Sequence, residues 1–270
     1  MSALAGSALR IVPPGMYAGR GLVVLERAVR VYRKAWLLIL TGFFEPLFFL
    51  FSLGNGLKSL IGTVDGPGGH PITYAAFIAP ALLASSAMNG AIYDSTMNVF
   101  FKMKFAKLYD GMLATSLGPL DVAIGEISWA LIRGGLYAAG FLVVMLAMGL
   151  TASAWAVLLL PAALLVAFGF AAVGMAITSY VQTFQQLELI TVAVLPMFLF
   201  SGTFYGLSVY PTWLRVVIQC LPLNHGVELL RDLNAGVFEW SMLGHVAYFV
   251  AMAVAGLAVT ARRLDRLLLR

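Results

Sequence analysis

The run AAGFLVVMLAMGL, residues Ala138–Leu150, decides the fold class because it holds no charge and does not alternate between apolar and polar positions. A membrane-spanning strand would alternate over about ten residues, so the run predicts a helix. The whole chain of 270 residues agrees, with 61% hydrophobic and 11% charged residues. Soluble domains have about 45–50% apolar and about 25% charged residues. A water-soluble globular protein is therefore excluded, and a helical membrane protein is predicted.

Similar hydrophobic runs recur along the chain and predict six transmembrane helices. Each spanning helix needs about 20 apolar residues, so six of them, with their tails and connections, leave little room for a separate soluble domain. We therefore predict a single all-α, polytopic transmembrane domain over residues 1–270. The predicted spans are residues 36–57, 72–97, 121–150, 155–180, 188–205 and 242–260.

The distribution of lysine and arginine predicts the orientation. Of the 17 basic residues, six lie in the N-terminal tail, three between spans two and three, and four in the C-terminal tail. With an even number of spans these segments share one face, and the positive-inside rule makes that face cytoplasmic. The same rule accounts for the net charge of +5 without a nucleic-acid partner. Both termini are predicted to be cytoplasmic.

The N-terminal residues 1–35 contain an amphipathic segment. Leu22, Leu25, Val29 and Tyr32 recur at helical spacing, and arginines occupy other positions around the helix. This pattern is typical of a helix that lies in the membrane interface, with lipid as its partner. The alternative is a basic flank that only fixes the orientation of the first span.

A second amphipathic segment, residues 99–117, lies in the predicted cytoplasmic connection. Apolar residues repeat there at i, i+4, i+7 and i+11, which predicts a short helix, and Gly118-Pro119 ends it. Two interpretations are open: a helix pinned to the lipid surface, or a docking helix for a cytoplasmic partner. The candidate docking residues are Lys102, Lys104, Phe105, Leu108, Tyr109, Asp110, Met112 and Leu113.

Residues 206–240 fall on the predicted outer side, and prolines and charges interrupt them too often for a span. Leu214, Val217, Ile218 and Leu221 nevertheless form an apolar stripe. Irregular backbone is tolerated at membrane depth where protein buries it or water reaches it. We predict two short re-entrant helices that close an outer gate, with a peripheral cap as the alternative.

Several charged residues fall inside predicted spans, Asp94 in the second among them, and Glu45, Glu126 and Arg133 are the candidate intramembrane charges. Glu126 and Arg133 are seven residues apart on one face of the third span, and a charge there normally faces protein or water. An intramolecular pair between them is favoured over contact with a substrate. Glu45 precedes Pro46 in the first span, where it could pair with Arg133 or face a cavity beside a proline kink.

Residues typical of catalysis or metal binding do not form a motif. His70, His225 and His245 are scattered and belong to no HExxH or Cys/His group, so no metal site is predicted. Residues 54–59 resemble a phosphate-binding loop, but Leu57 stands where glycine must precede the lysine. We therefore predict that the protein is not an enzyme and cannot hydrolyse ATP unaided.

Two stretches of this sequence, residues Tyr109–Glu126 with its Met-Leu-Ala-Thr run and residues Pro196–Arg231 with its Ser-Gly-Thr-Phe turn, resemble motifs of ABC-2 type exporter permeases, most closely the nodulation-factor and daunorubicin exporter permeases. YDGMLATSLGPLDVAIGE, residues Tyr109–Glu126, is similar to the family's docking helix and the start of its third span. PMFLFSGTFYGLSVYPTWLRVVIQCLPLNHGVELLR, residues Pro196–Arg231, is similar to its fifth span, Ser-Gly-Thr-Phe signature and outer helices. Two positions depart from the pattern, Ser116 and Gly206, where the family often has proline.

The resemblance implies an ABC-2 exporter (type V) fold in a bacterial inner membrane, forming half of a transporter. Two permeases, identical or paralogous, would assemble with two cytoplasmic ATPase subunits. ATP and magnesium would bind those subunits, with no cofactor bound directly by this chain, and the 99–117 helix would couple them to the spans. An amphipathic, lipid-linked or drug-like cargo would leave along a path lined by Phe44, Asn89, Tyr93, Met197, Phe200 and Phe204.

An ion-gradient-driven secondary transporter is the alternative function. Such transporters often carry acids or broken helices near the middle of the membrane. Glu45-Pro46 is the feature of this sequence that fits them best.

Overall fold

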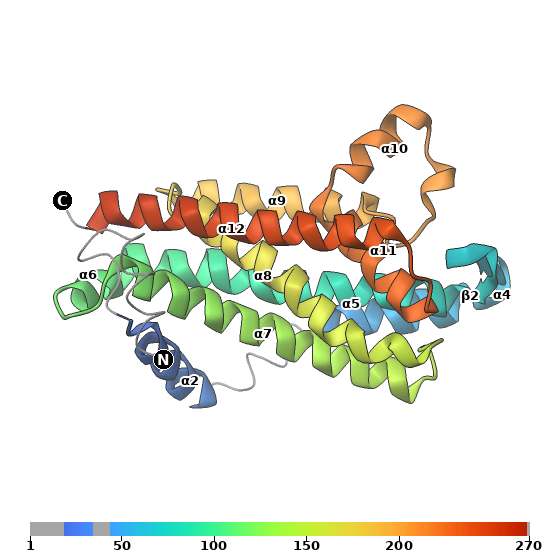
Figure 1. The fold of residues 1–270 in the computed structure, drawn as a ribbon, viewed down its shortest axis with the longest axis horizontal. Helices are drawn as coiled ribbons and strands as arrows, with labels where there is room; N and C mark the ends of the chain where they lie inside the picture. The colour runs from blue at the N-terminus through green and yellow to red at the C-terminus, as the bar shows by residue number, and fades with distance from the viewer. Residues whose placement is uncertain (1–18, 35–43, 269–270) are drawn as a thin grey trace.

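The computed structural model describes residues 19–34 and 44–268, which form a bundle of long helices aligned along one axis (Figure 1). Four helices are long and apolar enough to cross a membrane: 74–105, 119–147, 154–178 and 240–264. Two further apolar helices, Phe44–Gly54 and Phe184–Phe200, are shorter. They fall within the first predicted span and over most of the fifth, but residues 36–43 of the first span lie outside the described residues. The structure therefore supports four spans by length and composition and does not confirm six.

The elements carry the labels of Figure 1. In chain order they are α2 (Gly21–Lys34), η1 (Leu50–Asn55), α4 (Lys58–Ile61), β1 (Thr63–Asp65), η2 (Pro67–Gly69), β2 (Pro71–Thr73), α5 (Tyr74–Tyr93), η3 (Asp94–Asn98), η4 (Phe101–Phe105), α6 (Leu108–Leu113), α7 (Pro119–Ala147), η5 (Ala154–Leu158), α8 (Leu159–Thr178), α9 (Phe184–Phe200), η6 (Leu207–Val209), α10 (Thr212–Gln219), α11 (Pro222–Ala235) and α12 (Trp240–Leu268).

Helix α5 is the centre of the bundle, and α7, α8 and α11 pack against it. Nearly all of its side chains from Tyr74 to Ala91 are buried. Glycine allows the closest approach to α7, because a Cβ placed on Gly90 would lie 2.9 Å from the Cα of Gly134. Small residues permit such contact between helix backbones. The central position of α5 also holds the polar residues at its end inside the protein.

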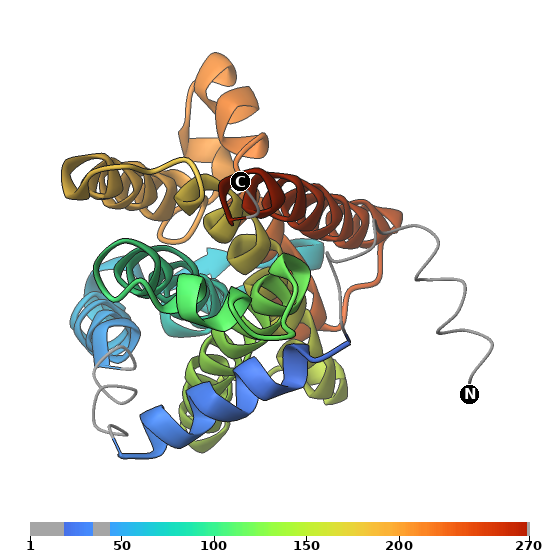
Figure 2. The same ribbon diagram turned by 90° about the vertical axis from the view of Figure 1, so that its left-hand side faces the viewer.

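Helix α2 lies across the bundle rather than along it, as the end-on view shows (Figure 2). It rests on α7, with Gly21, Val24 and Ala28 buried. The apolar stripe that the sequence predicted for the membrane interface therefore lies mostly outside this protein contact. Leu22 and Val29 are 72% and 44% exposed. An apolar stripe identifies a helix face but not the partner it meets, and here small residues make the protein contact.

A short antiparallel hairpin, which the all-α prediction missed, joins the first apolar helix to α5. Strand β1 pairs with β2 in the register Thr63↔Thr73, Val64↔Ile72 and Asp65↔Pro71. Gly68 and Gly69 in the turn have φ values of 73° and 75°, a left-handed backbone that glycine adopts without steric cost. The hairpin lies at the end of the bundle opposite α6 (Figure 1).

The prediction of one amphipathic helix over residues 99–117 is wrong. The helix that starts at Tyr74 continues to Phe105 through η3 and η4, and its residues Val99 and Phe100 are buried in the protein. Lys107 then adopts a left-handed conformation, φ 45°, which interrupts the helix. Only the six residues of α6 form a separate helix.

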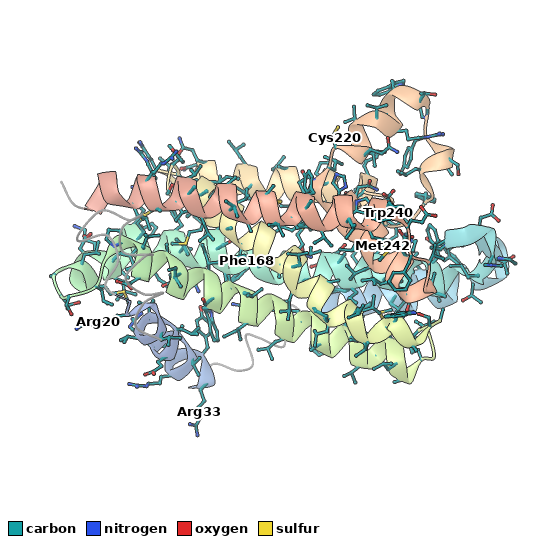
Figure 3. The ribbon with its side chains drawn as sticks, in the orientation of Figure 1. Arg20, Arg33, Phe168, Cys220, Trp240 and Met242 are labelled. Carbon is teal, nitrogen blue, oxygen red and sulfur yellow. The ribbon has the colours of Figure 1, made fainter. Side chains whose placement is uncertain are left out.

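Two helices occupy the 206–240 segment, and they differ in environment. Helix α10 projects away from the bundle at the hairpin end, and Cys220 marks the joint after it (Figure 3). Helix α11 returns to the bundle and packs against α5, α8 and α12. Leu223, Val227 and Leu230 are completely buried there. Whether these helices form a gate stays a prediction.

Candidate functional site

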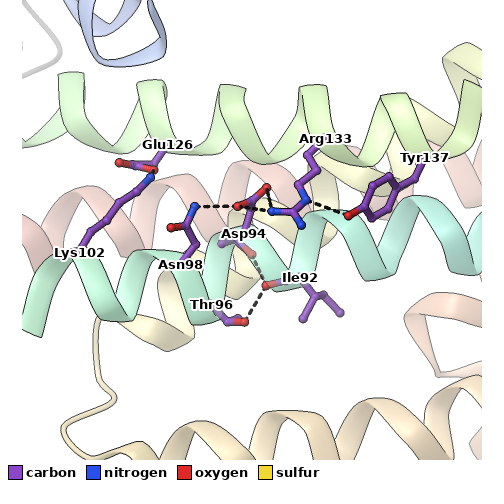
Figure 4. A network of polar contacts seen from close by, with 9 residues as sticks. Ile92, Asp94, Thr96, Asn98, Lys102, Glu126, Arg133 and Tyr137 are labelled. Carbon is purple, nitrogen blue, oxygen red and sulfur yellow. Dashed lines mark hydrogen bonds and ion pairs between the residues drawn. The ribbon is translucent and has the colours of Figure 1, made fainter. Parts of the chain in front are cut away.

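A buried polar network joins the end of α5 to α7 (Figure 4). The Nη1 of Arg133 lies 3.3 Å from both carboxylate oxygens of Asp94. Its Nε donates to the hydroxyl of Tyr137 at 3.0 Å, and the amide of Asn98 donates to Asp94 at 2.7 Å. Arg133 and Asp94 are only 5% and 2% exposed. A buried charge needs such partners, since an uncompensated one costs several kcal/mol.

Three tyrosine rings surround the Arg133 guanidinium. Its Cζ lies 4.8 Å from the ring centre of Tyr93, 5.6 Å from that of Tyr137 and 5.9 Å from that of Tyr32, within the range of cation–π attraction. Tyr32 comes from α2 and stacks on Trp129 at 4.8 Å. Burial and the nearby Asp94 carboxylate raise the pKa of Tyr32 to about 12. Arg133 therefore connects α2, the end of α5 and α7.

A second ion pair lies nearer the start of α7. The Lys102 ammonium is 2.6 Å from the Glu126 carboxylate, and the Glu126 side chain is only 3% exposed. The predicted pair between Glu126 and Arg133 is therefore wrong. Seven residues advance a helix by roughly 10 Å, which is too far for direct contact between these two side chains. Each instead binds an opposite charge on the adjacent helix.

Sequence reasoning missed Asp94 as the partner of Arg133, although the spacing carried a signal. Asp94 and Lys102 are eight residues apart on one helix, while Glu126 and Arg133 are seven apart on the next. The order of acid and base matches two antiparallel helices, so that each acid meets a base. Comparing the two spacings would have indicated both pairs.

The predicted docking residues divide into an inward and an outward set. Tyr109 and Met112 are 1% and 9% exposed, and Leu108 and Leu113 also pack against the core. Lys102 forms an ion pair with Glu126, whereas Lys104, Phe105 and Asp110 are exposed. Tyr109 and Met112 therefore hold α6 against the bundle and are not available to a partner in this conformation.

Tyr109 lies close to the second ion pair. Burial, together with the Glu126 carboxylate, holds the pKa of its phenol well above the usual range. The hydroxyl therefore stays protonated at neutral pH. Because Glu126 also binds Lys102, the α6 segment, α7 and the end of the α5 helix meet at one carboxylate.

The start of α7 is fastened to the segment before α2. The Gly118 N–H donates to one oxygen of Asp121 at 2.8 Å, and the Arg20 N–H donates to the other at 2.7 Å. The Arg20 side chain also contacts the hydroxyl of Ser116. These contacts place α2, the segment after α6 and the start of α7 in one assembly at what we call the basic end of the bundle.

A cavity of about 310 Å³ lies between the first apolar helix, α5 and α9. Two predicted path residues, Asn89 and Tyr93, line it together with Glu45. Of the two alternatives for Glu45, the structure supports the cavity rather than a pair with Arg133. Tyr93 is the ring closest to Arg133, so the cavity wall touches the buried network. The remaining lining is Ile92, Thr96, Met97, Ile190, Thr191, Val194, Leu195 and Phe198.

The other predicted path residues are spread around this cavity. Met197 lines an adjoining apolar groove of about 470 Å³, which shares Ile92, Thr96, Ile190 and Val194 with the cavity. Phe44 and Phe200 are 48% and 42% exposed. Phe204 is buried against Phe198, with ring centres 5.2 Å apart, so it does not line the cavity.

Five lining residues on α9 were missed, Ile190 and four others on one helix face. Thr191, Val194, Leu195 and Phe198 follow the spacing i, i+3, i+4, i+7 that defines one helix face. That periodicity was present in the sequence, but the prediction selected Met197 and Phe200, which lie on other faces of the same helix.

The Ser-Gly-Thr-Phe turn after α9 is tied to α5 and α11. Arg231 donates to the Gly202 carbonyl at 3.0 Å and to the Phe77 carbonyl at 3.4 Å. Its guanidinium lies 3.8 Å from the Phe77 ring centre, and burial lowers its pKa to about 10. Asn224 donates to the Ser201 carbonyl at 3.3 Å. The Ser-Gly-Thr-Phe part and the Arg231 end of the Pro196–Arg231 motif are therefore in direct contact.

Comparison with known families gives a match over most of the chain. Residues 21–234 match the family described as ABC-2 type transporter. The chain belongs to this family. ABC-2 permeases are embedded in the membrane, generally have no catalytic site of their own, and work in ABC systems with an ATP-binding subunit. Residues 19–34 and 44–268 contain no group of three or more His, Cys, Asp or Glu suited to a metal ion.

Individual relatives of this ABC-2 permease share the name Nodulation protein J. The protein from Rhizobium leguminosarum bv. trifolii is 30% identical over 260 residues, covering 95% of this chain and 93% of that protein. The one from R. leguminosarum bv. viciae is 29% identical over 253 residues, covering 92% and 95%. The one from Bradyrhizobium diazoefficiens is 30% identical over 253 residues, covering 90% and 93%.

Proposed function

We propose that the chain is the permease subunit of an ATP-binding-cassette exporter that moves an amphipathic, lipid-linked or drug-like molecule out of the bacterial cytoplasm. A separate subunit hydrolyses the ATP. The observation that carries the proposal is the position of α6, exposed on one side and joined on the other to the buried charges of α5 and α7. The basic end is cytoplasmic in this proposal, as the lysine and arginine distribution predicts.

The exposed residues at α6 form the proposed docking surface. Phe105 is 67% exposed, and Lys104, Asp110 and Gly111 are also exposed. Full burial of a phenylalanine contributes about 1.5–3 kcal/mol. Docking can transmit ATP binding only if its free energy differs between the two states of the ATPase, and couplings of about 1–3 kcal/mol are typical. Burial of Phe105 in one state alone would be sufficient.

Motion of α6 has a short route to the cavity. Tyr109 lies beside Glu126, which holds Lys102, and Lys102 belongs to the helix that also carries Tyr93. Arg133 connects Tyr93 with α7. A displacement of α6 would therefore shift the end of the α5 helix relative to α7 and change the wall of the cavity.

The cavity suits a cargo with both polar and apolar parts. Glu45, Asn89 and Thr96 supply polar groups, while Leu195, Phe198 and the adjoining groove supply apolar surface. The cavity opens beside the two shorter apolar helices. A second permease, identical or paralogous, is proposed to face that side, with two ATPase copies docked on the pair.

The alternative is a secondary transporter driven by an ion gradient. The observation that favours it is Glu45, an exposed carboxylate in the cavity beside Pro46. Carboxylates within membrane segments often mark ion or proton pathways.

Reconstitution separates the two functions. The chain is co-purified with an ABC ATPase subunit from the same genome, and transport of a fluorescent phospholipid analogue is measured in proteoliposomes. We expect transport that requires ATP and persists when ionophores collapse ion gradients. Phe105→Ser should reduce ATP hydrolysis coupled to the permease by about tenfold or more, in proportion to the lost burial.

Leu60→Ser is the matched control, because Leu60 is 80% exposed at the hairpin end. It should leave coupled hydrolysis unchanged. Transport that does not require ATP and stops when an ionophore collapses the ion gradient would support the secondary transporter instead. Equal effects of the two serine variants would reject Phe105 as a docking residue.

A further inference from the structure

We infer that α2 carries a binding site for the phosphate headgroup of an anionic phospholipid, formed by Arg27, Arg30 and Arg33. These three arginines, with Val31, line one surface hollow of about 820 Å³. All three are exposed, and Arg33 points away from the bundle (Figure 3). Arginine is suited to phosphate because its planar guanidinium can donate two parallel hydrogen bonds.

The charge on this helix is poorly balanced. Glu26 is the one carboxylate within Gly21–Lys34, and it lies 3.2 Å from Arg30. Their side chains are 65% and 80% exposed, and exposed pairs of this kind contribute little free energy. A phosphate could therefore replace Glu26 as the partner of Arg30 and also bind Arg27 and Arg33.

The level of α2 along the bundle fits lipid headgroups. Helix α7 has 29 residues and is about 44 Å long, while the hydrocarbon core of a bilayer is about 30 Å thick. The extra length of the helix belongs at the start of α7, where the charged residues Asp121 and Glu126 disfavour burial in the hydrocarbon core of the bilayer. Helix α2 crosses this part. A Cβ on Gly125 would lie 2.5 Å from Val24, and Tyr32 stacks on Trp129.

Apolar side chains beside the arginines fit the acyl-chain boundary. Leu22 is 72% exposed and Val29 44%. A helix with arginines on one side and exposed apolar residues on another is suited to the membrane interface. A soluble acidic protein could also bind the arginines, but it would leave these apolar residues in water. The observations therefore favour an anionic lipid.

Occupancy of this site would affect the buried network. The helix that carries the three arginines also places Tyr32 5.9 Å from the Arg133 guanidinium. Bound lipid would hold α2 on α7 and thereby hold Tyr32 in place. The inference does not depend on ATP coupling or on the cargo, so it can fail or succeed separately from the proposed function.

Lipid binding to the purified full-length chain tests the site. Binding of dioleoylphosphatidylglycerol and dioleoylphosphatidylcholine is measured in a neutral detergent by native mass spectrometry. We expect preference for phosphatidylglycerol, and weaker binding when Arg27, Arg30 and Arg33 are all replaced by Gln. A basic residue near an anionic surface contributes about fivefold in affinity, so the loss should be roughly 100-fold.

Arg262→Gln is the control, because Arg262 is exposed on α12 at the same end of the bundle. It should change the affinity by less than about fivefold, the contribution of a single base. The Glu26→Gln variant should bind phosphatidylglycerol several-fold more tightly, since the competing carboxylate is gone. This variant keeps the inference testable if the triple variant does not fold.

Several results would overturn the inference. Equal affinity for the two lipids would do so, as would full retention of binding in the triple variant or no tightening in Glu26→Gln. Displacement of the lipid by millimolar inorganic phosphate would identify a free-anion site instead. Displacement of phosphatidylglycerol by the purified ATPase subunit would identify a protein surface as the occupant.

Discussion

Arg133 shows at the scale of one residue how this chain keeps a charge inside a spanning helix. Its guanidinium is held by Asp94 and Tyr137 and covered by aromatic rings. The same contacts bring the cavity residue Tyr93 and the α2 residue Tyr32 to one side chain. Arg133 therefore stabilises the bundle and also lies between α2 and the cavity.

Replacing Asp94 should be costly because it leaves Arg133 without its carboxylate. We expect Asp94→Asn to lower the free energy of unfolding by about 3–5 kcal/mol, measured by chemical denaturation in detergent. Combining it with Arg133→Met should recover part of the lost stability, since the double variant no longer buries an unpaired charge. Asp110→Asn on the exposed face of α6 is the control and should change stability by less than about 0.5 kcal/mol. Additive losses in the double variant would contradict the assignment.

At this scale the sequence predicted environments better than partners. It correctly indicated that Glu126 and Arg133 face protein, and it placed Glu45 either at a cavity or against Arg133. It did not predict which charges meet. Pairing depends on the register between α5 and α7, and close contacts at Gly90 and Gly134 set that register only in the folded protein.

Among the elements, α12 shows how glycine sets the spacing of helices. A Cβ on Gly256 would lie 2.5 Å from the backbone of Ala172 on α8. Gly244, on the same helix, has nothing within 4 Å of its Cβ position. The two glycines therefore have the same helix propensity but different packing constraints.

Substitution at these two glycines separates packing from propensity. We expect Gly256→Val to push α12 away from α8 and to destabilise the protein by about 1–3 kcal/mol, as overpacking usually does. Gly244→Val should be close to neutral, because its side chain would enter open space. Thermal unfolding of both variants in the same detergent provides the measurement. Similar melting temperatures for the two variants would show that the α8–α12 contact is not tight.

Element boundaries were harder to predict than element types. The helical period from Phe101 to Met112 is real, but it spans two helices because Lys107 takes a left-handed conformation. Periodicity contains no information about such a break at a lysine. On α2 the predicted stripe includes the exposed Leu22 and Val29, but the sequence did not predict the second face, Gly21, Val24 and Ala28, that meets α7.

The whole molecule has a basic end, a hairpin end and a cavity at its side. Apolar runs of sufficient length predicted the bundle, and motif resemblance predicted the family that the comparisons confirm. The β1–β2 hairpin could not be predicted in the same way, because its three-residue strands carry no usable period. The central claim at this scale is that the α6 face receives the ATPase subunit.

Site-directed cross-linking tests that claim most directly. Cys220→Ser removes the only cysteine, after which Gly111→Cys on α6 and Trp213→Cys on α10 introduce one thiol each. Gly111 has open space around its Cβ position, and Trp213 is 69% exposed at the hairpin end. With a bismaleimide and the co-purified ATPase subunit, we expect a cross-linked product from Gly111→Cys and none from Trp213→Cys. A product from Trp213→Cys alone would contradict the account.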